Sequence, residues 1–255
     1  IITVGDPERV GAVSQYFSRI DFKLQKREFV SHLGKLNDKD VLVISTGIGP
    51  DNVEIVLTEL DGLVNMDATT RLPKEDKKKL SIIRMGTSGA LQADIPIGSY
   101  LISNWAIGLD NLLGFYQLPQ TEFESATGKA IQQKANLNFT PYVVPASSTL
   151  VKQVGEGMLL GNTLTCPGFY APQGRKVGIP ITYPNLLDNL ADFRQDDFRL
   201  TNFEMETSAY YAFGRMLGHD LLGANAILVN RVKNEFAGDS GPIVDGLTRR
   251  ILERI

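Results

Sequence analysis

The feature that most constrains the fold of this chain is the alternation of strand-like and helix-like segments along its 255 residues. Short apolar runs predict buried strands at residues 1–4, 40–46, 80–86, 98–107 and 221–232. Between them, helical spacing bounded by proline or glycine predicts helices within residues 5–17, 50–60, 204–218 and 241–255. Such alternation is typical of a single α/β domain with a parallel or mixed sheet, which we expect to span residues 1–255.

Two polar stretches interrupt this pattern, and we expect both to be loops or excursions of the domain. They cover residues 67–79, which include the charged run "KEDKKK", and residues 117–138. Neither resembles a Pro/Ser-rich linker, so neither predicts a domain boundary.

Composition limits the class of protein. The chain is 43% hydrophobic with a formal net charge of −3, so it can bury one large core and lacks the basic excess of a nucleic-acid-binding protein. The single cysteine, Cys166, excludes a disulfide framework and indicates a reducing compartment such as the cytoplasm. No apolar run is long enough for a membrane-spanning helix. Because Ile1 already lies in an apolar strand, we expect the native N-terminus to lie upstream of it.

Several common chemistries lack their motifs in this sequence. The segment "GIGPDN" at Gly47 lacks the third glycine of a dinucleotide-binding loop, and no GxxxxGK[ST] loop is present. His32 and His219 form neither an HExxH motif nor a Cys/His cluster, so we expect no zinc site. The segment "GTSGA" is not the GxSxG of a serine hydrolase.

Two glycine-containing segments each carry an arginine near the end of a predicted strand. "GDPER" contains Gly5 and Arg9, and "RMGTSGA" contains Arg84, Gly86 and Thr87. Glycine allows backbone N–H groups to approach an anion, and the guanidinium group is a planar, charged donor suited to phosphate oxygens. Ligands of open α/β sheets gather at the carboxyl ends of strands, so the two segments together predict a phosphate site.

Further motifs follow in a recognisable order. "GDPERV", "STGIG", "RMGTSGA", "FYAPQGR" and "NFEMET" are followed by "LVNR". Over most of the chain, from Gly5 to about Arg231, this series resembles the uridine phosphorylases, the uridine-cleaving branch of the nucleoside phosphorylase family. The pattern FYxxQxR is the most specific of these motifs.

The resemblance implies a fold and a reaction. The fold is a three-layer α/β sandwich with a central mixed, barrel-like sheet flanked by helices. The reaction is the reversible phosphorolysis of uridine to uracil and ribose 1-phosphate, catalysed by a pentosyltransferase of pyrimidine salvage. Phosphate is then a co-substrate, and no cofactor or resident metal is implied.

The resemblance also implies roles for individual residues. The phosphate site would consist of Gly5, Arg9, Arg27, Arg84 and Thr87. The ribose site would consist of Thr87, Glu204, Met205 and Glu206, and the base site of Phe169, Gln173 and Arg175. Arg84, Arg175 and Glu206 would be the catalytic residues.

The chemistry of the Glu-Met-Glu segment suits a sugar. An ionised carboxylate only accepts hydrogen bonds, so it can receive both hydroxyl protons of the 2′,3′-diol of ribose. The thioether of Met205 can lie along the apolar face of the sugar. The alternative is that Glu204 and Glu206 only favour the start of a helix.

Two further implications concern the assembly and a cation. Arg27 matches the arginine that the family lends to a neighbouring subunit, so the active unit would be a dimer, which the family often assembles into a hexamer. Some bacterial relatives bind a monovalent cation with a glutamate that Glu28 matches. The turn at Gly47 has one glycine fewer than is usual, which leaves that cation site open.

Three other functions stay open at this point. A purine nucleoside phosphorylase has an aspartate after its last strand, where this chain has Asn230 and Arg231. A nucleosidase uses water and lacks the phosphate arginines that Arg9 and Arg84 match. A non-catalytic nucleoside-binding protein is the remaining alternative. We expect no nucleic acid or membrane as a partner.

Overall fold

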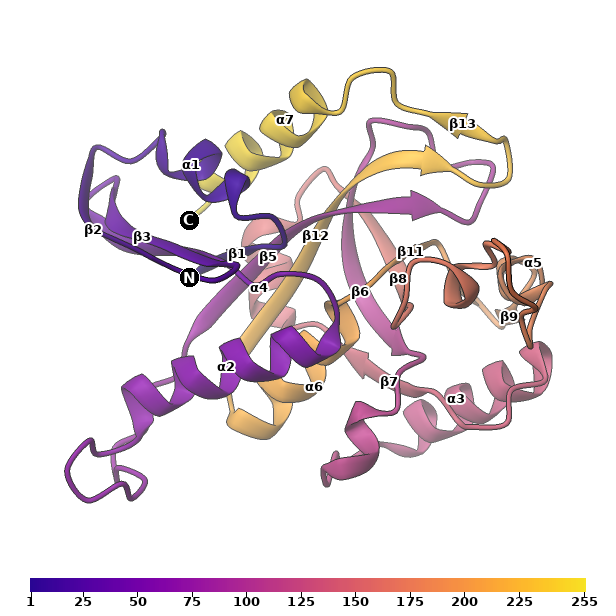
Figure 1. Ribbon diagram of the computed structural model, residues 1–255, viewed down its shortest axis with the longest axis horizontal. Helices are drawn as coiled ribbons and strands as arrows, with labels where there is room; N and C mark the ends of the chain where they lie inside the picture. The colour runs from indigo at the N-terminus through magenta and orange to yellow at the C-terminus, as the bar shows by residue number, and fades with distance from the viewer.

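A closed barrel of five strands forms the centre of the computed structural model, which describes residues 1–255 (Figure 1). Its strands are β5 (Ser81–Ala90), β6 (Tyr100–Gly108), β8 (Leu159–Thr165), β11 (Asn202–Glu204) and β12 (Asp220–Asn230). They follow one another in the order β12–β6–β8–β11–β5, and a β12–β5 pairing closes the ring. Three of the five pairs are parallel (β6–β8, β8–β11 and β12–β5), and two are antiparallel (β12–β6 and β11–β5). The expected mixed, barrel-like sheet is confirmed.

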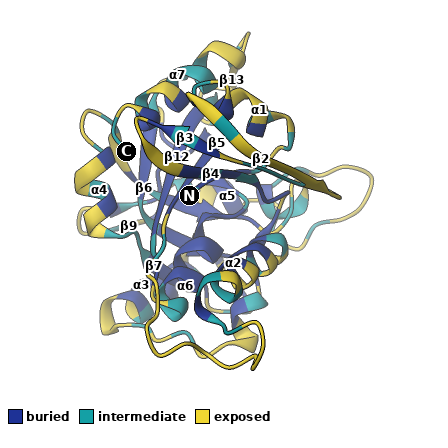
Figure 2. Ribbon diagram, turned by 90° about the vertical axis from the view of Figure 1, so that its left-hand side faces the viewer, coloured by how far each residue is buried: buried dark blue, intermediate teal, exposed yellow.

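The remaining strands extend the barrel at its margins. From β5 the sheet continues through β1 (Ile2–Val4), β4 (Lys39–Ser45), β3 (Phe29–Leu36) and β2 (Arg19–Lys26). On the other side β7 (Tyr142–Pro145) pairs with β6 and β13 (Glu235–Phe236) pairs with β12. A separate hairpin contains β9 (Arg194–Gln195) and β10 (Phe198–Arg199). Strand β2 is an edge and is almost entirely exposed, as Figure 2 shows.

Helices cover both faces of the sheet. Helices α1 (Glu8–Ser14) and α7 (Gly241–Leu252) lie on one side, and α2 (Pro50–Asn65) and α6 (Thr207–Leu217) lie on the other (Figure 1). The other helices are α3 (Glu122–Ala135), α4 (Ser148–Val154), α5 (Leu186–Ala191) and two short 3-10 helices, η1 (Leu112–Phe115) and η2 (Ala171–Gln173). Apolar cores fill the spaces between these helices and the strands, so the expected layered α/β architecture is confirmed.

Local signals account for the helix boundaries. Pro50 occupies the first turn of α2, where its missing N–H is no loss. Helix α6 ends at Gly218, which has a φ of 79°, a left-handed conformation that glycine adopts without steric cost. In α1, Val10 and Val13 lie three residues apart, as helical spacing requires, and both are buried.

Strand β5 is longer than its sequence predicts. We expected it to end at the Gly-Thr-Ser segment, but it continues to Ala90. The reason is that β12 pairs with it along its whole length, with Asn225 opposite Gly86 and Ala226 opposite Thr87. Arg84 therefore lies within a strand of the barrel and not at the end of one.

The structure contradicts a loop in one of the two polar stretches. Residues 117–138 contain helix α3, whose start is fixed by a capping box in which Thr121 and Glu124 exchange hydrogen bonds. The sequence "TEFE" carries that signal. Residues 67–79 are exposed and, apart from an isolated bridge between Met66 and Pro73, irregular, as predicted. No helix has the length and hydropathy that a membrane span requires.

Candidate active site

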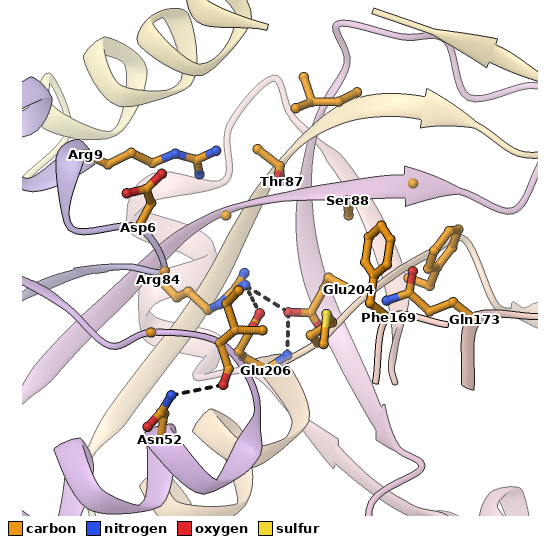
Figure 3. A pocket seen from close by; sticks show the side chains of 18 of the residues that line it. Asp6, Arg9, Asn52, Arg84, Thr87, Ser88, Phe169, Gln173, Glu204 and Glu206 are labelled. Carbon is orange, nitrogen blue, oxygen red and sulfur yellow. Dashed lines mark hydrogen bonds and ion pairs between the residues drawn. The ribbon is translucent and has the colours of Figure 1, made fainter. Parts of the chain in front are cut away.

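A cavity of about 780 Å³ lies at the carboxyl ends of β1, β4 and β11, next to the middle of β5. The structure brings ten of the eleven predicted site residues to its wall. They are Gly5, Arg9, Arg84, Thr87, Phe169, Gln173, Arg175, Glu204, Met205 and Glu206. Segments from the beginning, the middle and the end of the chain thus meet at one cavity (Figure 3).

Two arginines, Arg9 and Arg84, lie at one end of the cavity, together with the carboxylate of Asp6 (Figure 3). Arg9 extends from α1 toward the cavity, and Thr87 lies between it and the centre of the site (Figure 3). Burial lowers the pKa of Arg9, the nearby carboxylate of Asp6 opposes that shift, and the charge of Arg84 adds to it. Two guanidinium groups that repel each other across a cavity favour an anion between them.

Arg84 is the most constrained side chain of the site. Only 5% of it is exposed, and it forms an ion pair with Glu206 and a second, at 3.2 Å, with Glu204. Its Nη1 atom donates to Oδ1 of Asn225 at 3.3 Å. Burial opposes the charge of Arg84, but the two carboxylates raise its pKa, so the guanidinium stays charged.

Glu206 connects Arg84 to the turn after β4. Its Oε1 atom accepts a hydrogen bond from the backbone N–H of Gly49 at 3.0 Å. Gly47 and Gly49 have φ values of 74° and 96°, which explains why the "STGIG" segment contains glycine at these positions. Burial raises the pKa of Glu206, and the nearby carboxylate of Glu204 raises it as well. The charge of Arg84 lowers this pKa but does not cancel the rise.

Glu204 has a different environment from Glu206. Its Oε1 atom accepts from the hydroxyl of Thr165 at 2.8 Å, and its Oε2 atom accepts from the hydroxyl of Thr207 at 2.9 Å. The backbone N–H groups of Glu206 and Thr207 donate to the same carboxylate. Glu204 therefore holds the start of α6 and the position of Glu206, and offers little free capacity for a ligand.

The other end of the cavity is built by the "FYAPQGR" segment. The guanidinium carbon of Arg175 lies 3.9 Å from the centre of the Phe169 ring, and its Nη1 atom donates to the backbone carbonyl of Phe169 at 2.6 Å. The same nitrogen donates to Oε1 of Gln173, which leaves the amide N–H₂ of Gln173 without a protein partner. Burial and the nearby Arg231 lower the pKa of Arg175. This end thus presents an aromatic ring, an amide and a cation.

Sequence comparison identifies the family of the chain. Residues 1–254 match the sequence profile of the phosphorylase superfamily. The chain belongs to the phosphorylase superfamily. It is 30% identical to a uridine phosphorylase of Thermococcus kodakarensis, over 92% of this chain and 74% of that protein. It is 27% identical to a uridine phosphorylase of Haemophilus influenzae, over 94% of this chain and 83% of that protein.

A solved structure of the superfamily is also similar. The Trypanosoma brucei nucleoside phosphorylase, described as showing uridine phosphorylase activity, superposes with a TM-score of 0.90 and 28% sequence identity. The match covers 99% of this chain and 91% of that one. The fold is therefore that of a nucleoside phosphorylase.

Arg27 is the one predicted site residue that does not line the cavity. It is exposed in the turn between β2 and β3 and has a φ of 56°, while the next residue, Glu28, lines the cavity. The tip of this hairpin thus borders the site, but the Arg27 side chain is not part of its wall within one chain.

Sequence reasoning missed the apolar wall of the cavity. Ile48, Phe203, Leu228 and Val229 line it. They lie within the segments "STGIG", "NFEMET" and "LVNR", but no role was predicted for these apolar positions. Asn230 lies in the segment where a purine nucleoside phosphorylase would have an aspartate. Its side chain is buried, and its amide N–H₂ donates to the backbone carbonyls of Gln92 and Ile95. The wall next to it is therefore formed by Leu228 and Val229, and not by Asn230.

Proposed function

We propose that this chain catalyses the reversible phosphorolysis of uridine to uracil and ribose 1-phosphate. The observation that carries the proposal is a single cavity with Arg9 and Arg84 at one end and Gln173 and Arg175 at the other. Glu206 lies between the two ends, where the sugar would be. The relatives named uridine phosphorylase support the same substrate.

Phosphate is the nucleophile in this mechanism. Arg9, Arg84 and Thr87 hold it beneath the anomeric carbon of the ribose. Cleavage of the glycosidic bond builds positive charge on the sugar, as in glycoside hydrolysis, and the phosphate oxygens stabilise that charge before they attack. No carboxylate of the protein needs to form a covalent bond, so the protein acts by positioning and electrostatics.

Glu206 and Met205 bind the sugar. The carboxylate of Glu206 accepts hydrogen bonds from the ribose hydroxyls in addition to those from Arg84 and Gly49. Met205 is half-buried on the cavity wall and packs on the apolar face of the ribose. Glu204, whose oxygens are occupied, positions Glu206 for this task.

Uracil leaves with negative charge on its carbonyl oxygens. Arg175 stabilises that charge as it develops, which lowers the barrier and not only the dissociation constant. The free amide N–H₂ of Gln173 donates to a uracil carbonyl, and its oxygen accepts from N3–H with the lone pair that Arg175 does not use. The ring of Phe169, which is half-exposed, stacks on the base.

The active unit is a dimer in this proposal, and larger assemblies such as a hexamer would be built from it. Arg27 lies at the tip of a hairpin whose side chains Phe22, Leu24 and Leu33 are exposed. Phe22 and Leu33 are paired across β2 and β3, so these apolar groups share one face that a second copy can cover. Two-fold symmetry then places the Arg27 of each copy at the cavity of the other.

The reaction as proposed requires phosphate as a co-substrate and no cofactor. The buried thiol of Cys166, whose pKa burial raises, suits the reducing environment of the cytoplasm.

The test is the release of uracil from uridine with and without inorganic phosphate. We expect release that depends on phosphate, with cytidine and inosine cleaved far more slowly. Release without phosphate would make the chain a nucleosidase, and equal rates with inosine would indicate a broad or purine specificity. Tight uridine binding without any release of uracil would indicate a non-catalytic nucleoside-binding protein.

A further inference from the structure

A row of hydrogen-bonded polar side chains crosses the interior of the five-stranded barrel, one from each strand. We call it the polar row, and its members are Asn225 of β12, Ser103 of β6, Thr163 of β8, Asn202 of β11 and Ser88 of β5. The first four are fully buried, and Ser88 lines the cavity. Burying polar side chains costs free energy that apolar side chains of similar size would not cost, so the polar row is not explained by packing of the barrel alone.

The hydrogen bonds of the polar row run in one direction. The hydroxyl of Thr163 donates its only proton to Oδ1 of Asn202 at 2.9 Å. The hydroxyl of Ser103, 2.6 Å from that of Thr163, must therefore be the donor between the two. Its oxygen in turn accepts from the amide N–H₂ of Asn225 at 3.0 Å. Each member thus fixes the orientation of its neighbour.

Both ends of the row reach the candidate active site. At one end, the amide oxygen of Asn225 accepts from Nη1 of Arg84. If the side-chain amide of Asn225 were rotated by 180°, its N–H₂ group would face the N–H groups of Arg84. The hydroxyl oxygen of Ser103 opposes that rotation because it accepts a hydrogen bond from the N–H₂ group of Asn225. At the other end, the amide N–H₂ of Asn202 donates to the hydroxyl oxygen of Ser88 at 3.0 Å.

The bond from Asn202 has a consequence for Ser88. Because Ser88 accepts from Asn202, its own hydroxyl proton is not needed within the row. Ser88 makes no other side-chain hydrogen bond, and it lies between Arg84 and Phe169 on the cavity wall (Figure 3). Its hydroxyl proton can therefore point toward a ligand.

We propose that the polar row positions the two cavity residues at its ends, with Asn225 and Asn202 as positioning residues for Arg84 and Ser88. Arg84 is held between Asn225 on one side and Glu206 on the other, so its free N–H groups face the phosphate before the substrate binds. A donor fixed in advance costs no reorganisation during the reaction. Ser88 becomes an additional hydrogen-bond donor to the nucleoside. This inference rests on the proposed phosphorolysis.

The test breaks the row at its centre without touching the cavity. Thr163→Val replaces a hydroxyl by a methyl group of similar size, and Thr163 does not line the cavity. The matched control is Thr127→Val on α3, because Thr127 is equally buried and its hydroxyl has no hydrogen-bond partner. We expect Thr163→Val to lower kcat/KM roughly three- to tenfold, partly through a higher KM for phosphate, and Thr127→Val to change neither.

Two further variants separate positioning from packing. Thr163→Ser restores the hydroxyl but not the methyl group, so it should recover most of the activity lost in Thr163→Val. Asn225→Leu removes the contact with Arg84 itself and should raise the KM for phosphate by roughly tenfold or more. Unfolding temperatures of all variants, together with calorimetric titration of inorganic phosphate, show whether any loss follows stability or binding.

The outcomes distinguish the two proposals. Phosphate-dependent uracil release by the unmutated protein supports the proposed function whatever the variants do. If Thr163→Val then matches Thr127→Val in kinetics and phosphate affinity, or if Thr163→Ser is as impaired as Thr163→Val, the polar row has only a structural role and the inference is overturned. Absence of both release and phosphate binding in the unmutated protein overturns both proposals.

Discussion

Substituting Gly86 by alanine should displace the side chain that we place at the centre of the phosphate site. A Cβ atom at Gly86 would lie 2.0 Å from Nη1 of Arg84 and 2.7 Å from its Cζ. Ordinary contacts begin at 3.4 Å, so the guanidinium would have to move by about 1.4 Å. The buried Arg84 cannot make that movement without straining its contacts with Glu206 and Asn225.

The size of the effect follows from that displacement. A misplacement of about 1 Å in a catalytic arrangement can cost about 100-fold in rate. We therefore expect kcat/KM for phosphate to fall roughly 100-fold in Gly86→Ala, which corresponds to about 2.7 kcal/mol of transition-state stabilisation. Steady-state kinetics with uridine at saturation and phosphate varied would measure it.

A matched control separates this effect from the general cost of the substitution. Gly62→Ala lies in α2, where an added Cβ meets no atom within 4 Å. Because glycine is unfavourable inside a helix, this variant should be more stable by about 0.5–1 kcal/mol and equally active. A folded Gly86→Ala protein with an unchanged kcat/KM for phosphate would refute the role that we give to the position of Arg84.

Three further predictions concern the base, the dimer and pH. Gln173→Ala should weaken uridine cleavage while phosphate binding, followed by calorimetry, stays intact, whereas Arg175→Ala should lower kcat most; a loss of phosphate binding in Gln173→Ala would contradict the separation of the two ends of the cavity. Mixing inactive Arg27→Ala and Arg84→Ala subunits should restore part of the activity, since one hybrid site carries both arginines, and no recovery after proven subunit exchange would argue against a shared site. Because burial raises the pKa of Glu206, its charge is lost as pH falls through that raised value, so kcat/KM should decline on the acid side at a higher pH than an ordinary glutamate would give. The same raised pKa means that the folded protein is less stable when Glu206 is charged. As pH rises through the pKa of Glu206, the unmutated chain should therefore lose free energy of unfolding relative to Glu206→Gln. Parallel curves of unfolding free energy against pH for the two proteins would contradict this prediction.

The sequence by itself determined part of the fold, which comprises the strands β1, β4, β5, β6 and β12 and the helices α1, α2, α6 and α7, and it determined the kinds of residue in the site. It did not show the barrel strands β8 and β11. Apolar periodicity marks β1, β5, β12 and their helices because burial of one face is a local property of the chain. The motifs with Arg9, Arg84 and Gln173 are readable because glycine turns and charged side chains have few other uses in a buried setting. Helix α3 was missed, although its capping box is a local signal that the sequence carries.

Only the tertiary structure decided which way the polar side chains face. Glu204 and Glu206 are two residues apart in the same motif, yet one carboxylate is occupied by Thr165 and Thr207 while the other pairs with Arg84 and Gly49. The polar row, the closure of the barrel and the length of β5 likewise depend on pairings between residues that lie up to 141 positions apart. Local sequence fixes backbone preference and the pattern of burial, whereas the partners of a buried polar group are set by segments that meet only when the barrel closes.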